Sequence, residues 1–284
     1  MLRPKNNKTK PRIKHRPFLK WAGGKFRLTD DLNRVFPKRK QCLIEPFVGA
    51  GAVFLNSYFE RYILADINPD LINLFNIVKD NVDAYIEACK PIFFAENANT
   101  AEYYYAQRDA FNQSTDPFVR SVLFLYLNRF GFNGLCRYNS KNEFNVPFGA
   151  YKTHYFPEDE LRYFAHKAQS AVFLCADFQQ TFELADKHSV IYCDPPYAPL
   201  PQDTNFTGYA GNAFGFEHQK NLAECAKKAQ KEKQISVVIS NHDTKFTREI
   251  YKGAKFKRVK VQRSISQSSE KRVKVKELIA IFKG

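Results

Sequence analysis

Residues 41–66 read QCLIEPFVGAGAVFLNSYFERYILAD and contain two short apolar runs around a glycine-containing turn. The runs at 41–45 and 61–65 are typical of buried strands, and the residues between them suit a helix. The second run ends at Asp66, and helical spacing resumes over 69–78, where a proline fits the first helical turn. Strand, turn, helix and strand form a βαβ unit, so this stretch predicts an α/β protein with a parallel sheet.

The same rhythm returns in the second half of the chain. Strand-like runs occupy 172–175, 190–193 and 235–240, and a helical pattern covers 217–231. At the C-terminus, two segments alternate β-branched or aromatic residues with charged ones across a short polar stretch, which is a hairpin signal. We therefore expect a mostly parallel sheet with helices on both faces and an antiparallel C-terminal hairpin.

Residues 80–165 interrupt this pattern with helical stretches and a loop-rich segment dense in Asn, Arg and aromatic residues. An interruption of this length exceeds an ordinary connection and is typically functional. Residues 1–17 are polar, basic and broken by prolines, which predicts a disordered arm. The predicted organisation is a basic arm at 1–17, a core domain from 18–79 and 166–284, and a helical insertion at 80–165.

The composition of the 284 residues excludes several classes of protein. Hydrophobic residues make up 44%, which is too many for a disordered chain. No apolar run approaches the roughly 18 residues that cross a bilayer, and the N-terminus lacks the apolar segment of a signal peptide. The six cysteines form no C-x-x-C pair, so we expect reduced thiols, a cytoplasmic location and no metal site.

The net charge of +15 is concentrated at the two ends. Residues 1–16 carry seven Lys or Arg and no acid, and residues 252–284 carry eleven against two acids. Basic ends on a nearly neutral body indicate a polyanion partner, because Lys and Arg release the counterions condensed on phosphates. Charge alone does not separate this interpretation from tails that only aid solubility.

The turn Phe47-Val-Gly-Ala-Gly51 stands directly after the first strand. Two glycines at such a turn allow close approach of a ligand to the backbone. Asp66 follows Gly49 by 17 residues at the end of the next strand, where an acid is placed to bind both hydroxyls of a ribose. This pair indicates a nucleoside cofactor, although the third glycine of the dinucleotide fingerprint is missing and the turn alone is often only structural.

The motif Asp194-Pro-Pro-Tyr197 follows the strand at 190–193, at the sheet edge where α/β proteins bind ligands. Asp194 and the Pro195 carbonyl can accept the two N–H bonds of a planar amino group such as adenine N6, while Tyr197 stacks on the base. These contacts make the amino lone pair nucleophilic. Taken alone, the motif is also consistent with a proline-rich turn in which the Asp only caps a helix. Its position in the same predicted sheet as the glycine turn favours a catalytic role.

Together with Lys20-Trp-Ala-Gly-Gly-Lys25 and the insertion, these motifs resemble the N6-adenine DNA methyltransferases of the Dam type, in that family's order. The resemblance runs from about Phe18 to the C-terminus and includes 128–138 and 144–148. It implies a Rossmann-like methyltransferase fold, S-adenosylmethionine as methyl donor, no metal, and base flipping in duplex GATC sites. The implied cofactor contacts are Trp21, Lys25, Phe47, Gly49, Gly51, Asp66 and Asp194, and the implied catalytic residues are Asp194, Pro195 and Tyr197.

The residues of the insertion also favour DNA as the substrate independently of the resemblance, because Arg is the side chain best suited to bind guanine O6 and N7 together. Aromatic and apolar side chains near Arg137 can enter the gap left by an extruded base. By resemblance, Arg137 reads a guanine, other residues lie against bases, and basic or amide residues contact phosphates. The expected DNA-binding residues are Lys20, Arg108, Arg129, Phe132, Asn133, Leu135, Arg137, Asn139, Asn145, Pro147 and Lys152.

One position departs from the family pattern, since Ala150 stands where a basic residue often follows Pro-Phe-Gly. Flanking-sequence preference and processivity therefore stay open. The sequence predicts a monomeric DNA adenine methyltransferase and leaves two alternatives: an RNA adenine methyltransferase, and a DNA-binding regulator that has lost catalysis. It also leaves open whether the enzyme serves mismatch repair, DNA replication, gene regulation or a phage-type role.

Overall fold

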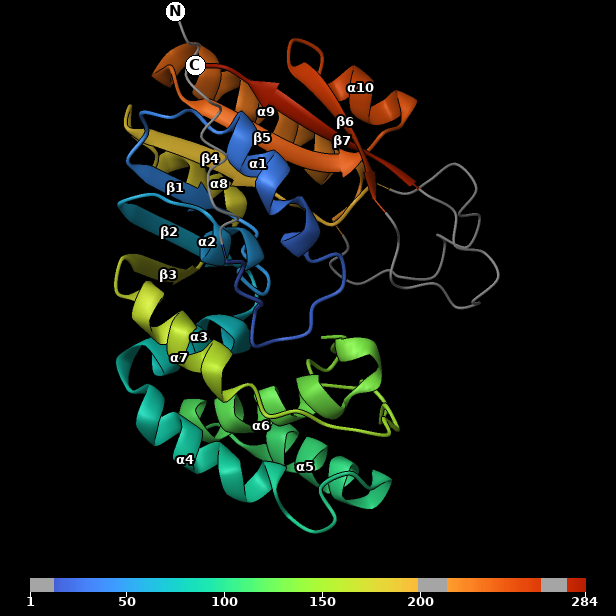
Figure 1. Ribbon diagram of the computed structural model, residues 1–284. Coiled ribbons are helices and arrows are strands. Elements are labelled where there is room, and N and C mark those ends of the chain that lie inside the picture. The colour runs from blue at the N-terminus through green and yellow to red at the C-terminus, as the bar shows by residue number, and fades with distance from the viewer. Residues whose placement is uncertain (1–12, 199–213, 262–274) are drawn as a thin grey trace, which may run out of the picture.

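The computed structural model describes residues 13–198, 214–261 and 275–284. Its centre is a seven-stranded sheet in the order β3-β2-β1-β4-β5-β7-β6 (Figure 1). The first five strands in this order are parallel, and β7 is antiparallel to both β5 and β6. The strands are β1 Cys42–Glu45, β2 Arg61–Asp66, β3 Ala171–Cys175, β4 Ser189–Cys193, β5 Ser236–His242, β6 Lys255–Val261 and β7 Val275–Phe282.

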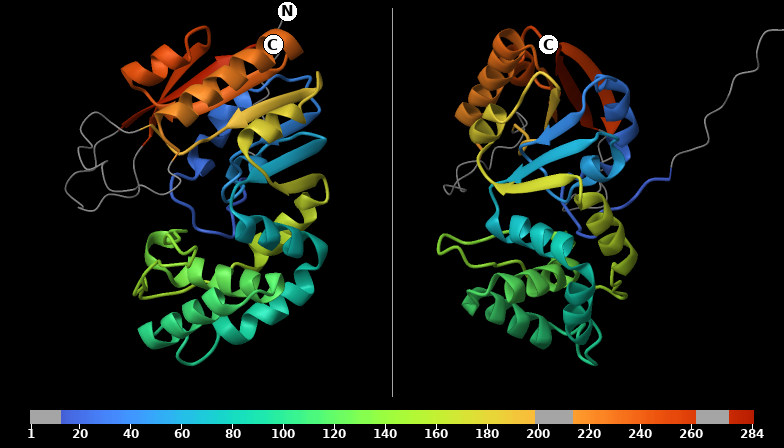
Figure 2. Two further views of the ribbon diagram at one scale, coloured as in Figure 1. Left: turned by 180° about the vertical axis from the view of Figure 1, so that it is seen from behind. Right: turned by 90° about the vertical axis from the view of Figure 1, so that its left-hand side faces the viewer.

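Helices cover both faces of the sheet. In the right-hand view of Figure 2, α8 and α9 lie on one face and α1 and α2 on the other. The central strands β1 and β4 are buried along their whole length, as expected for parallel strands covered on both sides. The core-domain helices are the 3-10 helix η1 Lys25–Leu28, α1 Thr29–Val35, α2 Ala52–Asn56, α3 Pro69–Asp80, α8 Phe178–Glu183, α9 Phe216–Lys233 and α10 Lys245–Ile250.

The insertion lies beyond the β3 edge of the sheet (Figure 1). Its elements are α4 Val82–Phe93, α5 Ala101–Gln113, α6 Pro117–Phe130, the 3-10 helix η2 Phe132–Gly134 and α7 Glu158–Ala168. Helix α6 is buried along most of its length and packs on α3 and α5. Thus α3 connects the sheet to the insertion.

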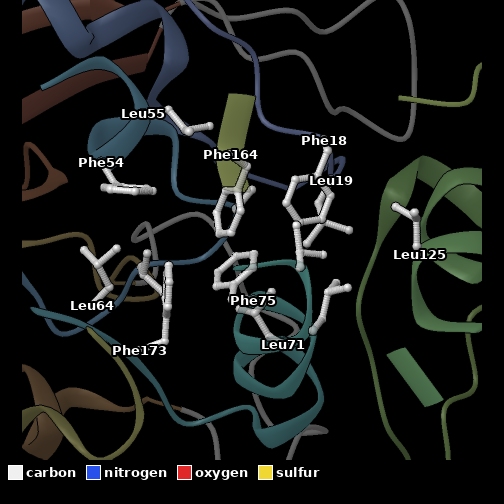
Figure 3. Packing of buried hydrophobic residues seen from close by; sticks show 14 of the residues in the cluster. Phe18, Leu19, Phe54, Leu55, Leu64, Leu71, Phe75, Leu125, Phe164 and Phe173 are labelled. Carbon is white, nitrogen blue, oxygen red and sulfur yellow. The ribbon is translucent and has the colours of Figure 1, made fainter. Parts of the chain in front are cut away.

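One continuous hydrophobic core joins the sheet to the insertion. Figure 3 shows Phe18, Phe75, Phe164 and Phe173 packed together from four separate segments. The rings of Phe18 and Phe164 meet edge to face at 5.0 Å, and those of Phe75 and Phe164 lie at 4.8 Å. Each fully buried aromatic side chain contributes about 1.5–3 kcal/mol of transfer free energy, so this core fixes the insertion against the sheet.

The predicted α/β fold is confirmed, including the antiparallel C-terminal pair. The turn of that pair, 262–274, lies outside the described residues, as do residues 1–12 of the predicted arm. Residues 13–17 of the predicted arm lie within the described residues. His15 stacks on Tyr163 at 3.4 Å, and its backbone N–H donates to Asn56 Oδ1, so the arm is already held on the body there. Helix α7 also runs across the boundary predicted at 165.

Candidate active site

A cavity of about 1080 Å³ opens at the carboxyl ends of the parallel strands. Glu45 ends β1, Asp66 ends β2 and Asp194 follows β4, and all three line it. Because β2, β1 and β4 are neighbours in the sheet, strand ends far apart in sequence meet at one edge. This is the place where open α/β sheets bind ligands, and the volume matches the upper range of ligand pockets.

Buried amides hold the turn at 194–197 in place. The Asn241 side chain, on β5, accepts from the Ala198 N–H at 3.1 Å and donates to Gln219 Oε1 at 2.9 Å. Gln219, on α9, in turn donates to the Pro196 carbonyl at 2.7 Å. Two prolines restrict the backbone of the turn, and this relay fixes the turn against both β5 and α9.

The two polar side chains of the turn have charged partners. Lys25 Nζ lies 2.9 Å from Asp194 Oδ1 and 4.6 Å from the ring centre of Tyr197. The Tyr197 hydroxyl donates to Glu277 Oε2 at 3.0 Å, and its ring packs edge-on against His242. Lys25 itself is only 6% exposed, so it faces the site rather than bulk solvent.

Burial raises the pKa of Asp194 to about 6, although the neighbouring Lys25 cation lowers it. Burial also raises the pKa of Glu45 well above its usual range, and the nearby Asp194 carboxyl raises it further. Asp194 is therefore ionised at neutral pH but sits close to the pH range in which it takes up a proton. Such perturbed carboxyls in a cavity are typical of functional sites.

The opposite half of the cavity contains the predicted cofactor residues. Asp66 accepts hydrogen bonds from the Gly49 N–H at 3.2 Å and the Asn68 N–H at 3.0 Å. Gly49 has φ +49°, and a Cβ placed there would lie 2.9 Å from the indole nitrogen of Trp21. Both the backbone conformation and the close ring therefore require glycine.

Each predicted cofactor residue except Gly51 lines this cavity, as do the three predicted catalytic residues. Gly51 instead has φ +74° and begins α2. Five carboxyls line the cavity, those of Glu45, Asp66, Asp177, Asp194 and Glu277, against the two cations Lys25 and Arg27. This excess of carboxyls favours a ligand that carries a positive charge.

The loop-rich part of the insertion, residues 132–148, is named here the recognition segment. Its Arg137 is exposed and donates from Nε to Asn145 Oδ1 at 2.7 Å and from one terminal nitrogen to the Asn145 carbonyl at 3.1 Å. Leu135 lines the cavity, and Phe132 is 48% exposed. The segment thus brings one predicted base contact, Leu135, to the cavity.

The remaining DNA candidates divide into exposed and junction residues. Lys20 Nζ donates to the Arg129 carbonyl at 2.7 Å and lies over the Tyr151 ring, and burial lowers its pKa to about 8. Burial also lowers the pKa of Arg129. Arg108 lies over a tyrosine ring, and the Asn139 side chain donates a hydrogen bond to Glu143. The backbone of Asn133 has φ +56°. Pro147 and Lys152 are exposed. Their contacts with DNA stay predictions.

The sequence analysis missed Gln219, Asn241, His242 and Glu277. Asn241 and His242 could have been predicted, because they end a strand at the same edge of the sheet as Asp194. The sequence carried no such signal for Glu277, because its place depends on the register of an antiparallel strand, in which it pairs with His242.

Within the described ranges, no group of three or more His, Cys, Asp or Glu side chains is arranged to hold a metal ion. No helix among those residues is long and apolar enough to cross a membrane.

Comparison with known proteins gives a family and close relatives. Residues 21–265 match the model of the D12 class N6 adenine-specific DNA methyltransferases. The chain is 82% identical over 282 residues to a DNA adenine methylase of Haemophilus influenzae, covering 99% of each chain. It is 58% identical to DNA adenine methylases of Vibrio cholerae and Escherichia coli, covering 95% of this chain and 96% of each relative.

Proposed function

Because the chain belongs to the D12 class of N6 adenine-specific DNA methyltransferases, we propose that it methylates adenine in duplex GATC sites after flipping the base. The supporting observation is the Asp194–Tyr197 turn, which is fixed in the wall of a cavity that Leu135 of the recognition segment also lines. A base inside a duplex cannot reach a recessed turn, so the adenine has to leave the stack.

Asp194 and the Pro195 carbonyl are the proposed acceptors for the two amino hydrogens of the flipped adenine. Accepting both hydrogens draws the amino nitrogen toward a tetrahedral geometry and directs its lone pair at the methyl carbon. N6 would gain a bond to the methyl carbon as the bond from that carbon to the sulfonium sulfur breaks, and N6 would release one of its two protons to water. Lys25 keeps Asp194 ionised, and Glu277 holds the Tyr197 ring upright for stacking on the base.

S-adenosylmethionine is the proposed cofactor, and it supplies an electrophilic methyl group on a sulfonium. Asp66 would hold its ribose, and Trp21 and Gly49 would border the same half of the cavity. The acidic lining favours its positive charge, because low-dielectric surroundings strengthen the attraction. No metal is required for this direct transfer.

Sequence preference is assigned to the recognition segment. Arg137 would bind guanine O6 and N7, Phe132, Asn133, Leu135 and Lys20 would lie against bases, and the other predicted DNA residues would contact phosphates. Asn145 already aligns the Arg137 guanidinium. We further propose that the enzyme acts as a monomer in the cytoplasm, with 80–165 as its target-recognition domain.

The test is methyl transfer from labelled S-adenosylmethionine to two duplexes that differ only in GATC against GTAC. Label confined to the GATC duplex is expected. Equal label in both would contradict the assignment of the recognition segment. Label in neither, together with transfer to RNA, would contradict DNA as the substrate.

A further inference from the structure

The recognition segment is attached to the same short stretch that carries the cofactor acid. Asp66 lines the cavity, and Asn68 caps α3 two residues later by accepting from the N–H groups of Asp70 and Leu71 at 3.0 and 3.3 Å. An Asn cap of this kind stabilises the start of a helix by about 1 kcal/mol. The backbone from Asp66 to Asp70 is thus fixed at its start by the hydrogen bonds to Asp66 and at its end by the Asn68 cap.

Asp70 is a buried carboxylate, 7% exposed, with a bidentate partner. Arg120 on α6 donates from Nε to Oδ1 at 2.8 Å and from a terminal nitrogen to Oδ2 at 2.9 Å. The same guanidinium donates to the carbonyls of Phe111 and Ser114 at the end of α5. This pair compensates the buried charge and fixes α3 relative to α5 and α6.

The carboxylate has a third donor, which comes from the recognition segment. The Tyr138 hydroxyl donates to Asp70 Oδ2 at 2.7 Å, and the Asn68 amide donates to Cys136 Sγ at 3.3 Å. Two side chains, at 136 and 138, therefore bind the first turn of α3. Arg137 stands between them and is exposed, with Asn145 as its partner.

We propose that Tyr138, through its hydrogen bond to Asp70, is a positioning residue that sets the sequence specificity of the enzyme. The bond holds the backbone on the C-terminal side of Arg137 against α3, the helix that starts just after the cofactor acid. Loss of the bond would release this anchor, so that Arg137 and its partner Asn145 could move together away from a guanine edge. This inference rests on the proposed GATC specificity and on the proposed guanine contact of Arg137.

The test compares Tyr138→Phe with Tyr126→Phe in the full-length protein. The Tyr126 hydroxyl is also buried in the insertion, but it donates to the Ala98 carbonyl, so its loss controls for a missing phenol bond. The measured quantity is the ratio of kcat/KM for a GATC duplex to that for an AATT duplex, in which both guanines are replaced and the target adenine stays. A hydrogen bond to a charged group predicts a fall in this ratio of about tenfold for Tyr138→Phe, with the KM for S-adenosylmethionine unchanged.

A second measurement separates positioning from general loosening of the structure. In an Arg137→Ala background, Tyr138→Phe should change the ratio no further, because two residues that act as one unit are not additive. Equal effects of Tyr138→Phe in both backgrounds, or equal ratios for the Tyr138 and Tyr126 variants, would overturn the inference. A parent enzyme that already treats the two duplexes alike would instead overturn the proposed specificity.

Discussion

The catalytic edge and the recognition segment serve the same reaction but are held in different ways. Asp66 ends a parallel strand and is paired in the sheet, whereas Asp194 directly follows the parallel strand β4, and the side chains of Asn241 and Gln219 hold the turn after it. Within 132–148, the regular structure is one 3-10 turn and single β-bridges. Arg137 is held there by Asn145, and its neighbour Tyr138 by Asp70.

This difference separates the residues that carry out methyl transfer from the residues that select the target sequence. A strand end is rigid because many backbone bonds would have to break before it moved, so the acceptors for the amino group are preorganised. A segment without a continuous ladder, held by scattered backbone and side-chain bonds, can change its target when one residue changes. We therefore expect substitutions at the two places to have separable effects, on rate at the sheet edge and on preference in the recognition segment.

The largest effect is expected at the catalytic edge. Asp194→Ala removes one of the two acceptors for the adenine amino group, and methyl transfer should fall at least about 10²-fold. Turnover measured with the labelled cofactor gives the rate, and circular dichroism confirms the fold. Near-normal turnover would refute the role of this carboxylate.

The next effect is expected in the recognition segment. Arg137→Ala removes a bidentate guanine donor that is worth about 1–3 kcal/mol, so discrimination between GATC and AATT duplexes should fall roughly 10- to 100-fold. The maximal rate on GATC should change much less. A variant that keeps its discrimination but loses its rate would reverse the roles assigned to the two regions.

The pH dependence sharpens the assignment at the catalytic edge. Burial raises the pKa of Asp194 to about 6, and the ionised carboxylate is the stronger hydrogen-bond acceptor for the adenine amino group, so kcat/KM should fall as the pH drops through about 6. Lys25→Gln removes the cation that lowers this pKa, and the inflection should move to higher pH. Glu277→Gln removes a neighbouring negative charge that raises it, and the inflection should move to lower pH. Shifts in the same direction for both variants would argue against Asp194 as the titrating group.

The smallest effect is expected for a change outside both regions, at the N-terminal end of the sequence. Residues 1–12 carry five Lys or Arg and no acid, and their deletion should flatten the salt dependence of DNA binding without changing discrimination. The slope of log affinity against log salt is the measurement. An unchanged slope would show that these charges do not meet the phosphates.

The sequence predicted the sheet and the catalytic edge because both depend on local signals. Asp66 and Asp194 each follow an apolar run, and the order of the elements placed them at one edge. The contact of His15 with Tyr163 could not be predicted, because it joins residues 148 positions apart. Asp70, Arg120 and Tyr138 carried no pattern, since their contact depends on how α3, α6 and the recognition segment pack.

The separation of the two regions is tested most directly by the binding preference of the Asp194→Ala variant. Its affinities for GATC and AATT duplexes are measured at one fixed salt concentration, beside those of the parent protein. The account predicts the same ratio of affinities in both proteins, although the variant transfers almost no methyl groups. A ratio that collapses together with the activity would contradict it, because the catalytic carboxylate would then also determine where the enzyme binds.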